Sequence, residues 1–343
     1  MPKLNSGRVV SLYPFSSPFN RYVDQFSEAI SRQGYITREF RWRPRVLWES
    51  DVIILHWPDE FFTTESKWRA FKSSLKLGLV WLLKVVRRTR LVWVAHNATP
   101  HEPKQSVPWL TRRFFQSVDG IIFLSAYSRQ LIGELYPESR ARRSLVTVLG
   151  HYRDTAVTPL SPSPIPSGSV KLVYVGVVRP YKNLEVLVEA AAQAPGLELL
   201  VCGMVMDKST GEALRSLSGR ARHIKLDLWD APLEDAAFEG VVDSADAVVL
   251  PYRNILNSGS VLFALSRNRP VLAPNIGSLP ELREQVGRDW VYLYDGEFNQ
   301  GVLTDFLAWM RETKRGEAAP LDSFAWSRIG QDLGQFIELV QSG

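Results

Sequence analysis

The chain has 343 residues, 45% of them hydrophobic and 22% charged, a composition that excludes a disordered chain and favours two globular domains. Its one cysteine, Cys202, excludes an internal disulfide and favours a reducing compartment. The net charge of +5 is uneven, because residues 1–150 carry 23 Lys and Arg against 12 Asp and Glu, so an anionic partner is expected for the first half alone.

Apolar strands alternate with helices along the first half. The predicted strands lie at 8–13, 36–40, 51–56, 91–96, 120–124 and 145–150. Continuous apolar strands separated by helices are typical of a parallel sheet covered on both faces. We therefore predict a doubly wound α/β domain over residues 1–155.

A long helix predicted from Lys67 to Arg88 is both apolar and basic. The stripe predicted to pack on the sheet comprises Trp68, Phe71, Leu75, Leu79, Leu82 and Val86. Other apolar residues lie off this stripe, and residues 67–90 hold eight Lys and Arg and no acid. This pattern predicts that the first domain contacts an anionic membrane surface, with a deeply buried helix as the alternative.

The chain shows no apolar stretch of the kind that spans or crosses a membrane. No run reaches the ~18 uninterrupted apolar residues of a spanning helix, and the first residues lack the apolar region of a signal peptide. We therefore expect a cytoplasmic protein, peripheral on the inner face of the plasma membrane.

Polar loops follow the first-half strands, where parallel sheets bind ligands. His101 and Glu102 lie after strand 91–96, and we interpret Glu102 as a general base with His101 orienting it, although the roles could be exchanged. Asp59, after strand 51–56, is the second candidate. A solvated loop is the alternative for His101 and Glu102. His96 and His101 have no third ligand at metal-binding spacing, so no metal site is predicted.

Strands and helices resume after a charge-free stretch with four prolines at 158–169. We predict a linker over residues 156–169, followed by a second doubly wound domain over residues 170–320. Its predicted strands lie at 170–176, 197–203, 223–229, 247–250, 270–273 and 291–294. An amphipathic helix is predicted at 324–340, near the end of the chain.

Two loops of the second half have the chemistry to bind phosphate. Ser258-Gly259-Ser260 opens an apolar helix, whose free N–H groups and dipole favour an anion, although a simple N-cap is the alternative. Strand 170–176 ends at Gly176, and the loop after it places Arg179 and Lys182 three residues apart. Two cations in one loop can hold one anion, and exposed surface charge is the alternative.

Aromatic and acidic residues near these loops complete the candidate site. Trp229 and Tyr252 end strands that are successive in the sequence, and either could stack on a nucleobase or serve in packing. Glu281 lies where it could hydrogen-bond to sugar hydroxyls. Asn183 and Asn257 belong to the same two phosphate-binding loops.

Residues 170–295 resemble the donor domain of the glycosyltransferases of the large bacterial family four and its relatives. Arg179 and Lys182 match the pair that grips the donor diphosphate in that family, and the stretches 264–265 and 269–274 match the helix and strand after the donor loop. Two glutamates of that family would fall at Ile255 and Phe263, which are not acidic. The Asn-Ser-Gly-Ser loop is more similar to bacterial exopolysaccharide glycosyltransferases, including those of the xanthan β-mannosyltransferase type.

This resemblance implies a GT-B fold, in which two Rossmann-like domains with doubly wound parallel sheets face a cleft and the segment 321–343 crosses back to the first domain. It implies a transferase that needs neither metal nor cofactor and acts in exopolysaccharide biosynthesis. The expected donor is a nucleoside-diphosphate sugar, with GDP-mannose first among these, and the expected acceptor is a lipid-linked oligosaccharide. The implied donor-binding residues are Gly176, Arg179, Lys182, Asn183, Trp229, Tyr252, Asn257, Ser258, Gly259, Ser260 and Glu281.

Two other functions stay open at this point. A nucleotide-sugar 2-epimerase of the same fold would act on the sugar nucleotide without an acceptor, and a non-catalytic protein could bind a nucleotide sugar alone. A dehydrogenase is disfavoured, because no G-x-G-x-x-G motif follows a predicted strand. Nucleic acid is not expected as a partner, since the basic charge lies on an apolar helix rather than beside stacking loops.

Overall fold

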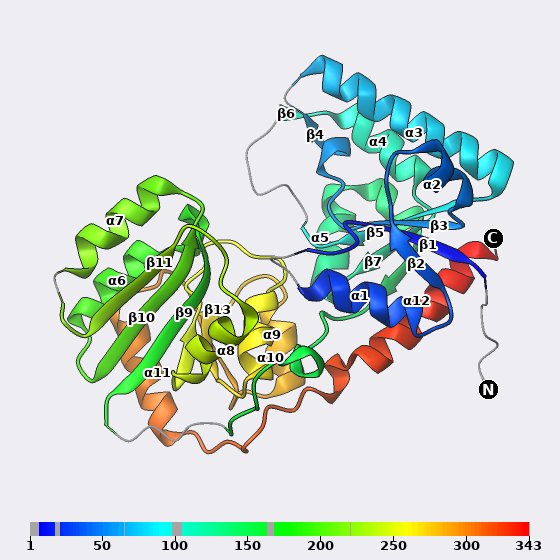
Figure 1. The fold of residues 1–343 in the computed structure, drawn as a ribbon. Helices are drawn as coiled ribbons and strands as arrows, with labels where there is room; N and C mark the ends of the chain where they lie inside the picture. The colour runs from blue at the N-terminus through cyan, green and yellow to red at the C-terminus, as the bar shows by residue number, and fades with distance from the viewer. Residues whose placement is uncertain are drawn as a thin grey trace. The chain divides into compact units, whose positions relative to one another are not determined.

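The computed structural model describes residues 7–17, 21–64, 66–97, 105–162, 168–219 and 221–342, and the chain forms two compact units (Figure 1). The first unit comprises Met1–Gly150 and Phe324–Gly343, and the second comprises His151–Ser323. The sequence predicts a first domain over 1–155, a linker over 156–169 and a second domain over 170–320, and the whole predicted linker belongs to the second unit.

The first unit is built on six parallel strands in the order β2-β1-β3-β5-β7-β8. The strands are β1 (Val9–Tyr13), β2 (Ile36–Glu39), β3 (Val52–Leu55), β5 (Arg90–Ala95), β7 (Gly120–Phe123) and β8 (Arg143–Val146). The helices are α1 (Arg21–Ser31), α2 (Pro44–Glu49), α3 (Lys67–Arg87), α4 (Pro108–Ser117), α5 (Ala126–Leu135) and α12 (Trp326–Gln341), with 3-10 turns η1 (Asp59–Phe61) and η2 (Pro137–Ala141). A short antiparallel pair, β4 (Thr63–Thr64) with β6 (Gln105–Ser106), lies apart from this sheet.

Helices cover both faces of this sheet, which explains why its strands are apolar without alternation (Figure 1). Residues of α1 and α12, including Phe26 and Phe336, pack with Val10 and Val92 on one face. On the other face of the sheet, residues of α3 and α4 pack against the strand side chains that point to that side. One predicted strand was placed too late: the strand expected at 145–150 is β8, at Arg143–Val146.

The long basic helix α3 packs on the sheet through the face opposite to the one predicted. Its buried residues are Ala70, Ser73, Leu77, Val80 and Leu83. The predicted stripe instead faces solvent, together with Trp81 and Val85, and these eight large apolar side chains are between 40% and 62% exposed. Spacing alone could not separate the two faces, because apolar residues occur on both. We call the exposed set the α3 face: Trp68, Phe71, Leu75, Leu79, Trp81, Leu82, Val85 and Val86.

The second unit repeats the architecture, with six parallel strands in the order β11-β10-β9-β12-β13-β14. The strands are β9 (Val170–Val178), β10 (Leu197–Val205), β11 (Ile224–Trp229), β12 (Ala247–Val249), β13 (Val271–Pro274) and β14 (Val291–Tyr294). The helices are α6 (Leu184–Gln193), α7 (Lys208–Ser218), α8 (Asp235–Asp243), α9 (Gly259–Ser266), α10 (Leu279–Val286) and α11 (Gln300–Glu312), with 3-10 turns η3 (Arg153–Thr155), η4 (Pro180–Lys182) and η5 (Asp322–Phe324). The predicted α/β class with two doubly wound parallel sheets is confirmed.

The described start of the proline-rich stretch is fixed on the second unit. The N–H and hydroxyl of Thr158 donate to the Glu239 carboxylate at 2.8 and 2.7 Å. The buried Arg267 guanidinium donates to the carbonyl oxygens of Thr158 and Pro159 at 3.1 and 2.9 Å, and pairs with Glu239 at 3.4 Å. Composition predicted a linker over 156–169, whereas residues 158–162 are held by a buried charged network that composition could not reveal.

Candidate active site

The predicted phosphate-binding loops leave the second sheet at one edge. β9 and β12 are parallel neighbours, so the turn η4 after β9 and the loop between β12 and α9 emerge side by side. The N–H of Arg253 donates to the Tyr181 carbonyl oxygen at 3.0 Å, and its Nε donates to Asn183 Oδ1 at 2.8 Å. These bonds fix the two loops to each other.

Lys182 is the central cation of this site. Its side chain is almost fully buried, with Nζ 3.7 Å from the ring centroid of Tyr252 and 4.9 Å from that of Tyr181. Burial lowers the pKa of Lys182, Tyr181 opposes the change by its interaction with the ammonium, and the charge of Arg179 lowers the pKa further. Because the charge of Arg179 lowers the pKa of Lys182, the two cations lie near each other. A cation stripped of water beside a second cation is suited to bind a polyvalent anion.

The start of α9 faces the same cluster. Ser258 caps the helix, because its Oγ accepts from the N–H of Val261 at 3.3 Å. Burial raises the pKa of the Tyr252 hydroxyl to about 12, while the side chains of Ser260 and Ser258 act in the opposite direction, which places them close to that hydroxyl. Tyr252 thus connects the Lys182 ammonium to the helix start. Cations and a helix N-terminus in one place can hold a diphosphate.

A glycine contact brings α10 beside the loop that leads to α9. Gly277 has φ +61°, and a Cβ there would lie 2.2 Å from the carbonyl oxygen of Ile255, so glycine is required. The N–H of Ser278 donates to the Leu256 carbonyl oxygen at 2.9 Å. Glu281 is in the first turn of α10, so the predicted acid is held near the predicted phosphate loop.

One predicted donor residue, Trp229, lies away from this cluster. The order β11-β10-β9-β12 puts two strands between Trp229, which ends β11, and Tyr252, so strands successive in the sequence are not neighbours in space. Gly176 lies inside β9, which continues to Val178, rather than at the end of the strand as predicted. A Cβ on Gly203 would lie 2.5 Å from the Gly176 carbonyl oxygen, so these glycines allow β9 and β10 to approach closely.

The positions that would carry the missing family glutamates have other roles. Phe263 is buried, with ring centroids 5.6 Å from Tyr152 and 4.9 Å from Phe238. Ile255 contributes its carbonyl oxygen to the Gly277 contact. Where the family has two carboxylates, this chain therefore has a packed phenylalanine at 263 and a backbone contact at 255.

Of the three predicted catalytic residues, one, Asp59, lies among the described residues. His101 and Glu102 lie outside the described residues. Asp59 begins the turn η1 after β3, and the structure describes its backbone alone. The assignment of these three residues stays a prediction.

A histidine pair that sequence reasoning missed lies at the carboxyl end of the first sheet. His56 follows β3 and His96 follows the neighbouring β5, and His56 Nδ1 and His96 Nε2 are 2.9 Å apart in a hydrogen bond. Trp57 stacks on His96 with ring centroids 4.4 Å apart, and Tyr22 meets it edge-on. Burial lowers the pKa of His56 to about 3 and that of His96 well below its usual value. Both rings are therefore neutral at pH 7. The sequence contains one indication of this pair, since each histidine directly follows an apolar strand.

The described part of the chain contains neither a cluster of metal ligands nor a membrane-spanning helix. Within it, no group of three or more His, Cys, Asp or Glu side chains is arranged to hold a metal ion. Across the same residues, no helix combines the length and apolar character needed to cross a bilayer.

Sequence comparison identifies curated relatives over nearly the whole chain. Two proteins described as GDP-mannose:glycolipid 4-beta-D-mannosyltransferase, both from Xanthomonas campestris pv. campestris, are 31% identical over 333 residues. The match covers 94% of this chain and 90% of each relative. No protein-family model matches the sequence.

Comparison with solved structures identifies the fold. A sucrose-phosphate synthase from Thermosynechococcus elongatus aligns with a TM-score of 0.68 at 15% identity, covering 98% of this chain and 99% of that one. The catalytic domain of starch synthase IV from Arabidopsis thaliana, bound to ADP and acarbose, aligns with 0.69 at 11% identity, covering 99% and 100%. An Anabaena protein in complex with UDP and glucose aligns with 0.61 at 14% identity, covering 98% and 97%. These neighbours show the GT-B architecture.

Proposed function

The chain belongs to the glycosyltransferase family of the GDP-mannose:glycolipid 4-beta-D-mannosyltransferases, and from this premise we propose that it transfers mannose from GDP-mannose to a glycolipid acceptor during exopolysaccharide assembly. The observation that carries the proposal is that Lys182, Tyr252 and the capped start of α9 lie together, with Arg179 close by, a set of groups suited to bind one anion. The relatives' name supplies the donor and the acceptor class.

The cluster supports departure of the nucleoside diphosphate without a metal ion. As the sugar–phosphate bond breaks, negative charge develops on the leaving diphosphate, and preorganised cations and N–H groups stabilise it. Arg179 and Lys182 supply the cations, and the first N–H groups of α9 supply the dipole. We propose that these groups replace the divalent cation that other diphosphate chemistry uses.

The acceptor hydroxyl must lose its proton when it attacks with inversion. Glu102, oriented by His101, is our proposed base, and Asp59 is the second candidate. The His56–His96 pair also ends strands of the first sheet, but its low pKa makes it a weak proton acceptor. The aromatic side chains around that pair fit an ordering role better than a catalytic one.

We further propose that the first unit rests on an anionic membrane surface through the α3 face. A soluble helix rarely leaves eight large apolar side chains so exposed, and contiguous apolar surface of this kind marks an interaction site. Cations lie against its rim: Lys72 Nζ is 5.2 Å from the Trp68 ring, and the Arg113 guanidinium is 5.8 Å from the Trp109 ring on α4. Tryptophan and basic residues around an apolar stripe favour the interface of an anionic bilayer. Such contact would bring the enzyme to a lipid-borne acceptor.

The function is tested by donor-dependent release of GDP in the presence of a glycolipid acceptor. Arg179→Gln should lower kcat/KM by roughly 10- to 100-fold, because a charge-assisted contact to the diphosphate is lost. Arg222→Gln removes an exposed arginine of the same unit and serves as the matched control. Full turnover by Arg179→Gln would contradict the site assignment, and a mannose-derived product formed without acceptor would instead select the epimerase.

A further inference from the structure

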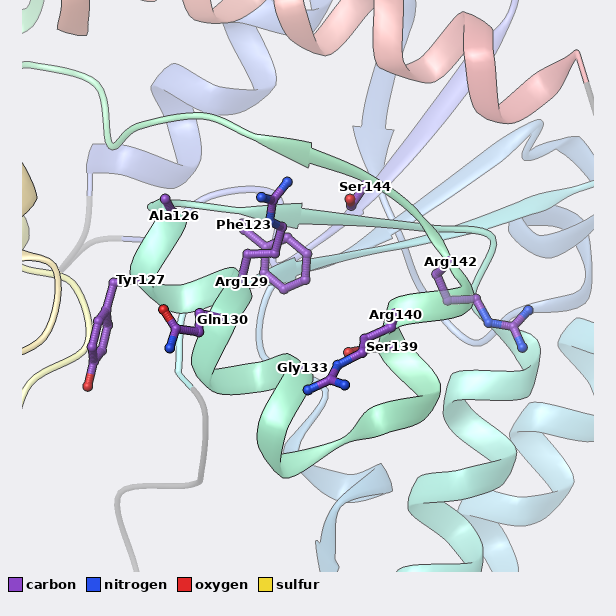
Figure 2. Close-up of a pocket in the computed structure, with 10 residues that line it drawn as sticks. All are labelled: Phe123, Ala126, Tyr127, Arg129, Gln130, Gly133, Ser139, Arg140, Arg142 and Ser144. Atoms are coloured by element: carbon purple, nitrogen blue, oxygen red, sulfur yellow. The ribbon is translucent and has the colours of Figure 1, made fainter.

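A hollow on the first unit lies between α5, the turn η2 and the edge strand β8 (Figure 2), and it shares no residue with the proposed donor cluster of Arg179, Lys182, Tyr252 and Ser258. Its volume is about 760 Å³, within the range of small-molecule sites. Phe123 forms part of its wall, and the other lining residues are largely polar or cationic, with no acid among them. The chemistry of the lining therefore favours an anion.

Arg129 on α5 and Arg140 on η2 are the cations that matter here. Both side chains are exposed, and within the described part of the chain neither has a hydrogen bond or an ion pair. In Figure 2 the Arg129 side chain crosses the Phe123 ring, and Arg140 extends toward Gly133 of α5. A Cβ on Gly133 would lie 3.2 Å from Arg140 Nε, so the glycine lets this arginine lie against the helix.

A third arginine, Arg142, also lines the hollow. The three guanidinium groups point in different directions in Figure 2, and Arg142 Nη1 donates to the Val118 carbonyl oxygen at 3.5 Å. Its Nε is enclosed and has no hydrogen-bond partner among the described residues. Arg142 therefore adds positive potential without occupying the hollow.

Two acids lie near the hollow in the sequence, and neither of them lines it. Glu138 pairs with Arg112 at 3.4 Å, and Glu134 accepts from Gln130 at 3.0 Å. Elsewhere in the first unit, arginines such as Arg90 have acidic partners. Arg129 and Arg140 thus line a hollow that has no acidic side chain in its lining, and their planar donor groups are suited to phosphate oxygens.

We propose that this hollow is a second anion site, which binds a phosphate-bearing ligand through Arg129 and Arg140. Its volume exceeds that of a single phosphate, so the ligand is a larger phosphate ester. The source is either a soluble phosphate ester or the headgroup of an anionic lipid. The site is distinct from the donor cluster and does not depend on the donor being GDP-mannose.

The test compares the paired variant Arg129→Gln/Arg140→Gln with Arg32→Gln/Arg45→Gln. The control removes two arginine charges from exposed side chains of the same unit, which are 58% and 88% accessible. One arm titrates pyrophosphate by calorimetry with saturating GDP present, so that the donor cluster is occupied. The other arm measures sedimentation with phosphatidylglycerol vesicles and, for comparison, phosphatidylcholine vesicles.

The site is supported if the paired variant loses about tenfold or more in affinity while the control changes by less than about twofold. Loss in the pyrophosphate arm supports a soluble ligand, because pyrophosphate stands in for its phosphate groups, and loss confined to the phosphatidylglycerol arm supports a lipid headgroup. The inference is overturned if the wild-type protein binds in neither arm, or if variant and control weaken equally, since the effect is then general charge. Failure of GDP itself to bind would count against the proposed function and not against this site.

Discussion

At the scale of residues, the buried Lys182 is the centre of the proposed donor site. Lys182 is enclosed by Tyr181 and Tyr252, and both its burial and the charge of Arg179 favour the neutral amine. A diphosphate bound beside it favours the ammonium instead. Ligand binding and protonation of Lys182 are therefore coupled.

We expect GDP binding to take up protons at pH values above the pKa of free Lys182. Affinity should be greatest below that pKa, where the lysine is already charged, and should fall as the pH rises past it, because binding then has to supply the proton. Calorimetry in two buffers of different ionisation enthalpy measures this uptake. Lys182→Met should lose it together with roughly 10- to 100-fold in affinity, whereas the exposed Lys208→Met should retain both. Identical heats in the two buffers across the pH range would contradict the coupling.

The buried histidine pair has a consequence for acid stability. The pKa of His56 is about 3 in the folded protein and close to 6.5 when unfolded, so between these values the unfolded chain binds more protons. Stability should therefore be lost as the pH falls below 6.5, by up to about 1.4 kcal/mol for each pH unit from this residue. Urea unfolding at pH 7 and pH 5 measures the loss. His56→Phe should lower the free energy of unfolding at pH 7, but this free energy should then fall less steeply between pH 7 and pH 5. An unchanged pH dependence would contradict the proposed role of His56.

At the scale of elements, α3 shows how one helix can serve two environments. Its narrow face of Ala70, Ser73 and Leu77 docks on the sheet, and its broader apolar face is left uncovered. Covering that face would remove several large side chains from water, each worth up to about 1.5–3 kcal/mol when fully buried. This supports a bilayer as its proposed partner.

Substitutions on the two faces of α3 should change different properties, vesicle binding for the exposed face and stability for the buried face. Leu75→Ser/Leu82→Ser changes exposed positions, so we expect binding to phosphatidylglycerol vesicles to weaken while the melting temperature changes little. Leu77→Ala creates a cavity in the core and should cost about 2–5 kcal/mol in stability, with vesicle binding of the folded protein retained. Sedimentation and thermal melting report the two effects. Full vesicle binding by the serine variant would exclude the α3 face as the docking surface.

At the scale of the whole molecule, the chain divides into two units with separate sheets and separate cores. The donor cluster is built entirely from residues of the second unit, and the α3 face and the arginine hollow belong to the first. Each unit therefore has its own proposed ligands. The two sets of interactions can be measured separately.

GDP should protect the second unit selectively. A ligand present at 100 times its Kd stabilises the state that binds it by about 2.7 kcal/mol, provided that it does not bind the unfolded chain. Hydrogen exchange should therefore slow in β9, α9 and α10, with smaller changes in β1 and β3. Protection confined to the first unit would place the nucleotide elsewhere.

The sequence by itself determined the fold class and most strands, because continuous apolar runs must be covered on both faces of a parallel sheet. It also indicated Arg179, Lys182 and the Ser258 loop, since cations and a polar helix start in an apolar setting have little structural purpose. It misplaced the exposed face of α3 and set Trp229 beside Tyr252, because both faces of that helix are apolar and strand order cannot be read from chain order. The His56–His96 bond, the desolvation of Lys182 and the uncompensated arginines around the hollow were decided by tertiary structure alone, since each depends on distances between residues far apart in the chain.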